Sequence, residues 1–348
     1  MKKSIIILLA VLLIFTLMIT GCKPNTDTVI DVTENVTEAE LPVLDKEFKI
    51  AFLLCDSGFK DSSNISLWDG AEKFSADSGI AIANFQVPLA TLADEIIDPI
   101  VAEGYNVYIN NNGTINSKLI EKANQNPDSI FACLEDPFDI SGASNLISAT
   151  IRAEESAFIA GYVTAVKSEA HKVGFLCGTQ NTSAQPLEYG FAKGVKYADE
   201  QKGTTTEIVN KYIGNGYNPE VGEQMATELY AEGCDILFVA VCGESGEGAM
   251  KVVKDSGKSC VVLGDIAPLA PDAVILTVKK ANDLSVYDVL TKITNGTLKG
   301  GEKYSYGIED GFAGFEENDQ NEVKLGAELL AEINEISQKI VSGEIITQ

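Results

Sequence analysis

The chain has 348 residues and a formal net charge of −25, from 51 acidic and 26 basic side chains. A chain of this length has room for about two ordinary domains. Nucleic-acid binding needs a clustered basic face, so this charge balance argues against a DNA or RNA partner. The acidic surface is more simply a feature that keeps the protein soluble.

The first residues indicate where the protein resides. Lys2 and Lys3 precede an apolar run over 5–19, which is short for a membrane-spanning helix and ends in the sequence ITGC at Cys22. This resembles a bacterial lipoprotein signal, which implies cleavage of 1–21 and lipid attachment to Cys22. We therefore expect a lipid-anchored protein on the extracytoplasmic face of the cell membrane; an uncleaved anchor helix is the alternative.

The segment 22–47 is rich in Thr, Asp, Glu, Asn and Pro and has no apolar periodicity. We interpret it as a flexible tether between the membrane and the folded part of the chain.

After residue 48 the predicted elements alternate between strands and helices. The apolar run Ile50–Leu54 predicts a buried strand, and a polar loop then leads into an amphipathic helix with Ser63 or Asn64 as its cap. Further strands are predicted at 80–87, 105–109, 130–134, 145–151, 173–177, 207–213, 236–241, 260–263, 273–278 and 304–308. Helices are predicted at 92–102, 115–123, 154–166, 187–198, 220–231, 246–254, 282–293 and 323–341.

Repeated strand–helix units predict parallel sheets covered by helices on both faces, which is an α/β fold. Because the series restarts after the polar stretch 167–171, we expect two similar Rossmann-like lobes joined by a hinge. The first lobe comprises 48–166 with part of 279–305. The second comprises 167–278 with part of 306–348.

The sequence offers little for catalysis. The single histidine, His171, lies between a predicted helix and strand, and no GxSxG, Walker or HExxH motif occurs. The cysteines other than Cys22 form no CxxC pair, which disfavours a metal site and favours buried apolar roles. A glycine-rich stretch over 243–248 is a weak phosphate signal, and as a turn it lets backbone approach a ligand.

Polar residues cluster after predicted strands, where parallel sheets bind ligands. They are Asp61, Asn64, Asn110, Asn111, Asn112, Glu135, Asp136, Gln180, Asn181, Tyr217, Asn218, Gly243 and Asp265. Such groups can face one another across a cleft between two lobes, with carboxylates and amides for hydrogen bonds and aromatic rings for stacking.

Several motifs resemble the basic membrane protein family of lipoproteins, whose best understood members are purine-nucleoside-binding proteins of ABC importers. They include the loop DSSN over 61–64, the segment RAEESAFIAGY that begins at Arg152, GFAKGVK over 190–196, and GIEDGFAG over 307–314. The resemblance covers residues 49 to about 315 and implies a type I periplasmic-binding-protein fold. It also implies a binding protein with a permease partner, and neither an enzyme nor a cofactor-containing protein.

Carried over residue by residue, the resemblance implies a nucleoside site. Asp61, Ser62, Ser63 and Asn64 would lie in the first loop, and Glu135 or Asp136 would hold the base. Tyr217 would stack on the base, and Gly243 would let backbone approach the sugar. Asp265 and Lys280 would contact the ribose hydroxyls.

This sequence departs from the family pattern at Ser63, where a second stacking phenylalanine is expected, and Phe59 is the candidate replacement. We therefore expect a monomeric, lipid-anchored receptor for a purine nucleoside. A receptor for another flat heterocycle such as a flavin, a sensor without transport, and a hydrolase using Asp61 and Glu135 are the alternatives.

Overall fold

The computed structural model describes residues 47–348 apart from 61, 135–138, 179–183, 215–217, 242, 265–266 and 299. The predicted signal peptide, Cys22 and nearly all of the predicted tether therefore lie outside the described residues. Within the described part, no helix combines the length and apolarity needed to cross a bilayer.

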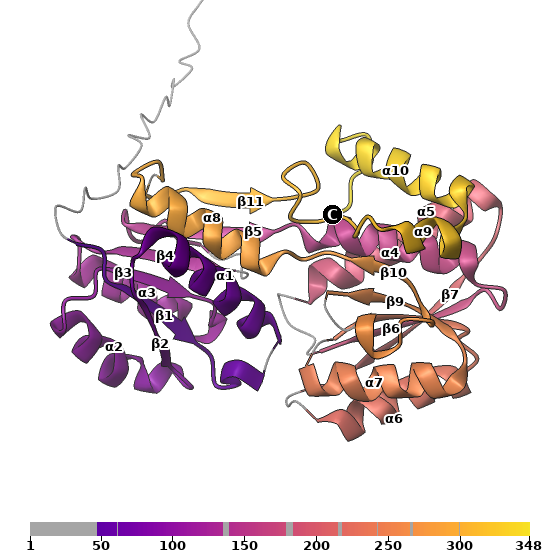
Figure 1. The fold of residues 1–348 in the computed structure, drawn as a ribbon, viewed down its shortest axis with the longest axis horizontal. Coiled ribbons are helices and arrows are strands. Elements are labelled where there is room, and N and C mark those ends of the chain that lie inside the picture. The colour runs from indigo at the N-terminus through magenta and orange to yellow at the C-terminus, as the bar shows by residue number, and fades with distance from the viewer. Residues whose placement is uncertain are drawn as a thin grey trace, which may run out of the picture. The chain divides into compact units, whose positions relative to one another are not determined.

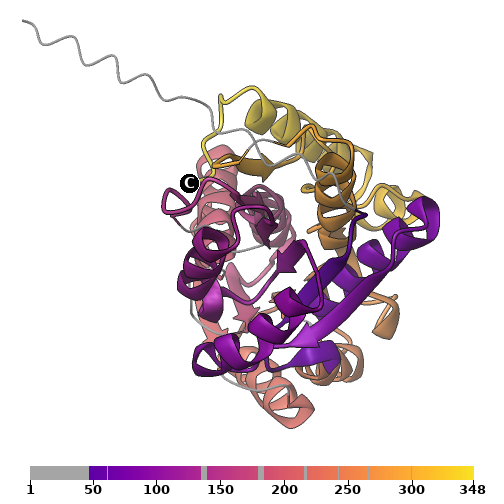
Figure 2. The same cartoon turned by 90° about the vertical axis from the view of Figure 1, so that its left-hand side faces the viewer.

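The first sheet has six parallel strands in the order β11-β5-β4-β3-β1-β2. They are β1 (Ile50–Leu54), β2 (Ile82–Gln86), β3 (Val107–Asn110), β4 (Ile130–Leu134), β5 (Leu146–Ile151) and β11 (Lys303–Tyr306). Its helices are α1 (Ser62–Ser78), α2 (Ala93–Ala102), α3 (Asn116–Gln125) and α8 (Asn282–Thr294). Figure 1 and Figure 2 show these helices on the two faces of the sheet.

Strand β1 shows why this sheet is covered on both sides. Ile50, Phe52 and Leu54 pack in one core with α1 and α8, whereas Ala51 and Leu53 pack in another with α2 and α3. Successive side chains of a strand point to opposite faces, and helices cover both faces of this sheet. All five residues are therefore buried.

The second sheet has five parallel strands in the order β10-β9-β8-β6-β7. They are β6 (Lys172–Cys177), β7 (Glu207–Tyr212), β8 (Ile236–Ala240), β9 (Ser259–Leu263) and β10 (Val274–Val278). Its helices are α4 (Ala153–Lys167), α5 (Gln185–Lys202), α6 (Pro219–Ala231), α7 (Gly243–Ser256), α9 (Asp319–Leu325) and α10 (Ala327–Val341). Short 3₁₀ helices occur at Gly58–Lys60, Ala90–Leu92, Gly113–Ile115 and Ala267–Leu269.

Helix α4 packs in the core of the second sheet. Its residues Phe158, Ile159 and Val163 share a cluster with Phe175 of β6 and Phe238 of β8. The predicted boundary near 167 assigns this helix to the first lobe. In the structure the chain passes to the second sheet at Arg152, one helix earlier.

The chain returns to the first sheet between β10 and α8, and leaves it again after β11 (Figure 1). The late elements are thus exchanged between the two sheets.

The C-terminal helix expected over 323–341 is interrupted. Gly326 adopts φ 85° and ψ 152° and separates α9 from α10. This backbone region is essentially restricted to glycine, so the residue ends one helix and begins another without a side-chain clash.

Glycines also set the close approach of α6 and α7. A Cβ added to Gly222 would lie 1.9 Å from the carbonyl oxygen of Ser245, and one added to Gly248 would lie 2.0 Å from that of Pro219. The glycine-rich stretch after β8, over 243–248, forms the first turns of α7 and not an open turn.

Four buried cysteines, Cys133, Cys177, Cys234 and Cys260, contribute to the cores. Burial raises the pKa of the Cys234 thiol to about 11 and that of Cys260 to about 12, which leaves both thiols protonated and unreactive near neutral pH.

Candidate ligand-binding cleft

A cavity of about 320 Å³ lies where three segments meet: the first turns of α1, the carboxyl end of β9, and the turn from β10 into α8. Its lining residues are Ser63, Ser66, Asp69, Leu263, Gly264, Lys279, Lys280, Ala281, Asn282, Asp283 and Glu316. The cavity is thus bounded by elements of both sheets, at strand ends where open parallel sheets bind ligands.

Two of the predicted site residues, Ser63 and Lys280, line this cavity together. Gly264, which directly precedes the predicted Asp265, also lines it. Asp61, Glu135, Asp136, Tyr217 and Asp265 lie outside the described residues.

Of the other predicted site residues that the structure describes, Phe59, Asn64 and Gly243 are not among those that line this cavity. Ser62 begins α1, and Gly243 begins α7 with φ 64°. Phe59 is 43% exposed, and its ring centroid lies 5.8 Å from that of Trp68. A stacking role for Phe59 on a ligand stays a prediction.

Asn64 is buried and braces the loop that follows β1. Its Nδ2 donates to the carbonyl oxygen of Gly58 at 2.6 Å, and its Oδ1 accepts a hydrogen bond from Asn111 in the loop after β3. Because α1 begins at Ser62, the expectation that Ser63 or Asn64 caps the helix is wrong. Asn64 instead holds two strand-end loops together.

Sequence reasoning missed Ser66, Asp69, Asn282, Asp283 and Glu316 as lining residues. A signal was present in α1, where Ser63, Ser66 and Asp69 recur at a spacing of three and so share one side of the helix. The buried Leu67, Ala71 and Phe74 define the adjoining, core-facing side.

The backbone of the turn between β10 and α8 is fixed by its neighbours. The Ser156 hydroxyl donates to the carbonyl oxygen of Lys279 at 2.6 Å, and Ala281 N–H donates to the carbonyl oxygen of Phe312 at 2.9 Å. Lys279 and Lys280 therefore project from a rigid turn. Together with Asp69, Asp283 and Glu316 they give the lining two positive and three negative side chains.

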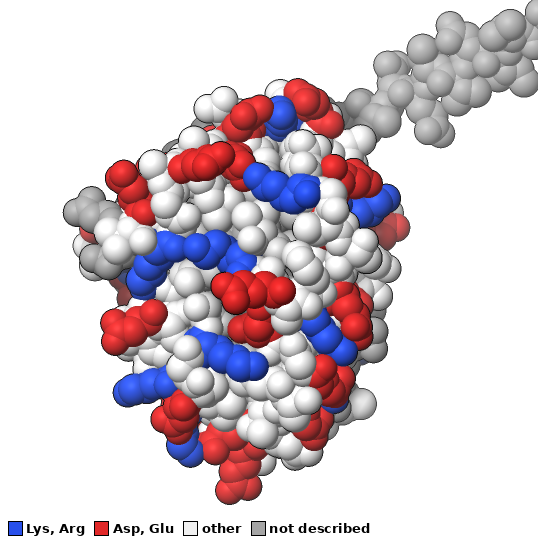
Figure 3. Space-filling model, turned by 90° about the vertical axis from the view of Figure 1, so that its right-hand side faces the viewer, with Lys and Arg blue, Asp and Glu red and all other residues white. Residues whose placement is uncertain are grey.

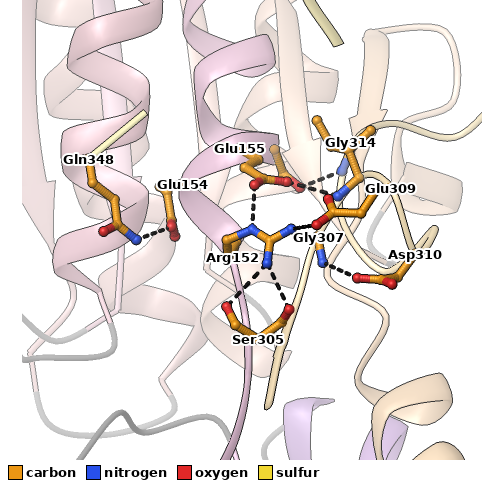
Figure 4. A network of polar contacts seen from close by, with 11 residues as sticks. Arg152, Glu154, Glu155, Ser305, Gly307, Glu309, Asp310, Gly314 and Gln348 are labelled. Carbon is orange, nitrogen blue, oxygen red and sulfur yellow. Dashed lines mark hydrogen bonds and ion pairs between the residues drawn. The ribbon is translucent and has the colours of Figure 1, made fainter. Parts of the chain in front are cut away.

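The crossing between β5 and α4 carries a second polar network (Figure 4). Arg152 Nε lies 2.5 Å from Glu155 Oε1, and its Nη1 donates to the carbonyl oxygen of Ser305 at 2.7 Å. Arg152 also pairs with Glu309, and Ile308 N–H donates to Glu155 Oε2 at 2.8 Å. Arg152 and Glu155 thus join two of the segments that pass between the sheets.

Burial raises the pKa of Glu155 above its usual range, while Arg152 and the Ile308 N–H act in the opposite direction. Burial lowers the pKa of Arg152, but its bonds to Glu155 and Glu309 outweigh that effect and the pKa is raised. Arg152 is therefore a fixed positive charge at the crossing between β5 and α4, which we call the hinge.

Two other cavities lie away from the predicted residues. One, of about 370 Å³, lies between β10 and α9, and the other, of about 540 Å³, lies between α4, α5 and α10.

Across the described residues, no group of three or more His, Cys, Asp or Glu side chains is placed to hold a metal ion. The face shown in Figure 3 carries lysines and arginines interspersed with acids.

Comparisons with known proteins agree with this architecture. Residues 48–348 match a family model described as "ABC transporter substrate-binding protein PnrA-like". A solved ABC transporter solute-binding protein from Aeropyrum pernix K1 has a TM-score of 0.76 at 19% identity, covering 86% of this chain and 94% of that one. The likeness to that structure confirms the predicted fold of two parallel-sheet lobes.

Among curated proteins, basic membrane protein A of Borreliella burgdorferi is 35% identical over 232 residues, 64% of this chain and 65% of that protein. The match thus spans just under two thirds of that relative's length. Basic membrane protein D of the same species is 28% identical over 312 residues, 86% of this chain and 87% of that protein. These matches confirm the family resemblance that the sequence motifs indicated.

Proposed function

Because the chain belongs to the family of PnrA-like ABC transporter substrate-binding proteins, we propose that it binds a purine nucleoside and delivers it to a permease. The observation that supports this most is the cavity lined by Ser63 on one side and Lys280 on the other. The family is one of binding proteins and not of enzymes, in keeping with the expectation from sequence.

The chemistry of the cleft suits a neutral ligand rich in hydroxyl groups and ring nitrogens. Serine hydroxyls, the Asn282 amide and three carboxylates can exchange hydrogen bonds with hydroxyls, and the lysine ammonium groups donate to oxygen or nitrogen acceptors. Binding by closure of two lobes around a ligand requires no covalent step.

Isothermal titration calorimetry against purine nucleosides, pyrimidine nucleosides and riboflavin tests this proposal. We expect micromolar or tighter binding of a purine nucleoside, and a loss of about tenfold or more in affinity for Lys280→Ala. Lys251→Ala removes a lysine that is paired with Glu223 on the protein surface and serves as the matched control. Failure of every purine nucleoside to bind overturns the ligand assignment, and binding of riboflavin alone replaces it.

The lipid anchor at Cys22 and the transport role belong to the same proposal. Cys22→Ala is expected to release the protein from the membrane fraction and to abolish incorporation of labelled fatty acid.

Deleting the gene is expected to lower nucleoside uptake, whereas a sensor without transport leaves uptake unchanged. A monomer is expected in size-exclusion chromatography with light scattering.

A further inference from the structure

Asn282 is an unusual member of the cleft wall. It is the first residue of α8, it is among the residues that line the cavity, and only 4% of it is exposed. Its Oδ1 is buried and has no hydrogen-bond partner among the described residues. Buried side-chain polar atoms are normally paired, so this oxygen requires a physical reason.

Helix capping does not supply that reason. Asparagine near a helix start usually caps it, and the Oδ1 of Asn218 does so for α6 by accepting a hydrogen bond from Glu220 N–H at 2.9 Å. In α8 the cap position is Ala281, without a side-chain cap. The backbone of Asn282 is already bonded, since its N–H donates to Lys280 and its carbonyl accepts from Ser285 Oγ, both at 2.8 Å.

The surroundings of Asn282 indicate which part of a ligand would meet it. Ser63, Ser66, Asp69 and Lys280 line the same cavity, and all of them recognise polar atoms. A wall of hydroxyl, carboxylate and ammonium groups suits the hydroxyl-bearing part of a ligand better than its flat ring.

We propose that Asn282 is a specificity-determining residue that exchanges a hydrogen bond with a hydroxyl group of the bound ligand. This inference rests on the proposed function. A hydroxyl group both donates and accepts, so it satisfies the amide in either of its two orientations. A ligand that lacks the hydroxyl leaves the buried amide unpaired and is rejected for that reason.

The test combines removal of the amide with removal of ligand hydroxyls. Asn282→Leu keeps a similar side-chain shape without polar atoms, and calorimetry compares it with the unmodified protein against purine nucleosides that each lack one sugar hydroxyl. We expect a loss of about tenfold in affinity for the complete nucleoside, and no loss for the one analogue that lacks the contacted hydroxyl.

Thermal unfolding of the ligand-free protein separates this role from a structural one. Replacing an unpaired buried amide by an apolar group of similar shape leaves the Tm unchanged or raises it, whereas loss of a structural hydrogen bond lowers it. Asn295→Leu is the matched control, because Asn295 lies at the other end of α8 and its Oδ1 accepts from Thr297 N–H at 3.1 Å. It is expected to lower the Tm and leave affinity unchanged.

The other outcomes contradict either this inference or the proposed function. Unchanged affinity of Asn282→Leu for a nucleoside that the unmodified protein binds overturns the inference and leaves the proposed function standing. An equal loss for every analogue also overturns it, because that pattern reports packing. Failure of the unmodified protein to bind any nucleoside overturns the proposed function and this inference with it.

Discussion

The hinge at Arg152 and the cleft wall at the start of α8 treat their polar groups in opposite ways. At the hinge, Arg152 reaches Glu155, Glu309 and Ser305, so its guanidinium is bonded on several sides. At the cleft wall, Asn282 keeps a buried oxygen unpaired among the described residues. The contrast is between polar groups at the hinge that hold the fold together and one amide in the cleft wall that we propose to pair with a ligand.

The largest expected effect comes from breaking the hinge network. Arg152→Met leaves the carboxylate of Glu155, whose side chain is 7% exposed, without its partner. Removing one member of a buried ion pair costs about 3–5 kcal/mol, so the free energy of unfolding should fall by about that amount in urea denaturation. A loss below about 1 kcal/mol, as is typical of an exposed pair, contradicts a structural role for this network.

Lys73→Ala is the matched control for Arg152→Met. Lys73 pairs with Asp77 at 2.7 Å, but both side chains are about half exposed or more. Exposed pairs of this kind contribute little, so we expect a change of about 0.5 kcal/mol or less.

A second prediction separates stability from binding by means of two glycines. A Cβ on Gly70 of α1 would lie 2.1 Å from the carbonyl oxygen of Asp283, and one on Gly161 of α4 would lie 2.2 Å from that of Phe191. Gly70→Ala and Gly161→Ala should each destabilise the protein by about 1–3 kcal/mol, because helices in contact must move apart.

Only Gly70→Ala should also weaken ligand binding, because Asp283 lines the cleft. Calorimetry and chemical denaturation of the two variants test this pair of expectations. Equal affinities in the two variants would show that the position of α8 does not control the site.

The smallest expected effect is the pH dependence of Glu155. Because its pKa is raised in the folded state, its contribution to stability is fully present below the unfolded pKa, about 4.3, and is lost as the pH rises through the folded value. The stability of the unmodified protein relative to Glu155→Gln should therefore be highest at about pH 4 and decline toward neutral pH. Urea denaturation of both proteins across this range measures the difference, and a constant difference contradicts the raised pKa.

Much of the fold could be predicted from the sequence. Strand β1 consists of five successive apolar residues, because parallel strands are buried on both faces, and the alternation with helices follows from such runs. The order of the strands could not be predicted from the sequence, since β1 lies between β2 and β3 and β11 joins the first sheet from far along the chain. Strand order depends on long-range pairing, which leaves no local signal.

Among the predictions that differ from the structure are one for the C-terminal helix and one for helix α4. The apolar stripe of the C-terminal helix continues past residue 326, and only the backbone angles at Gly326 divide it. Helix α4 is so apolar that its sequence requires burial without specifying against which sheet. Of the candidate site, the structure brings Ser63 and Lys280 together, whereas the other predicted ligand contacts stay predictions.

The sequence by itself determined the class of fold and the family. Apolar runs that indicate strands buried on both faces, and the spacing of glycine and polar motifs, can be recognised in the sequence directly. Only the tertiary structure decided that Asn282 lies in the same wall as Ser66 and Asp69, and that its amide oxygen is left unpaired. The physical reason is that a sequence records which side chains must be buried or bonded. Which distant groups supply the partners, and which partners are missing, depends on how the two sheets are joined.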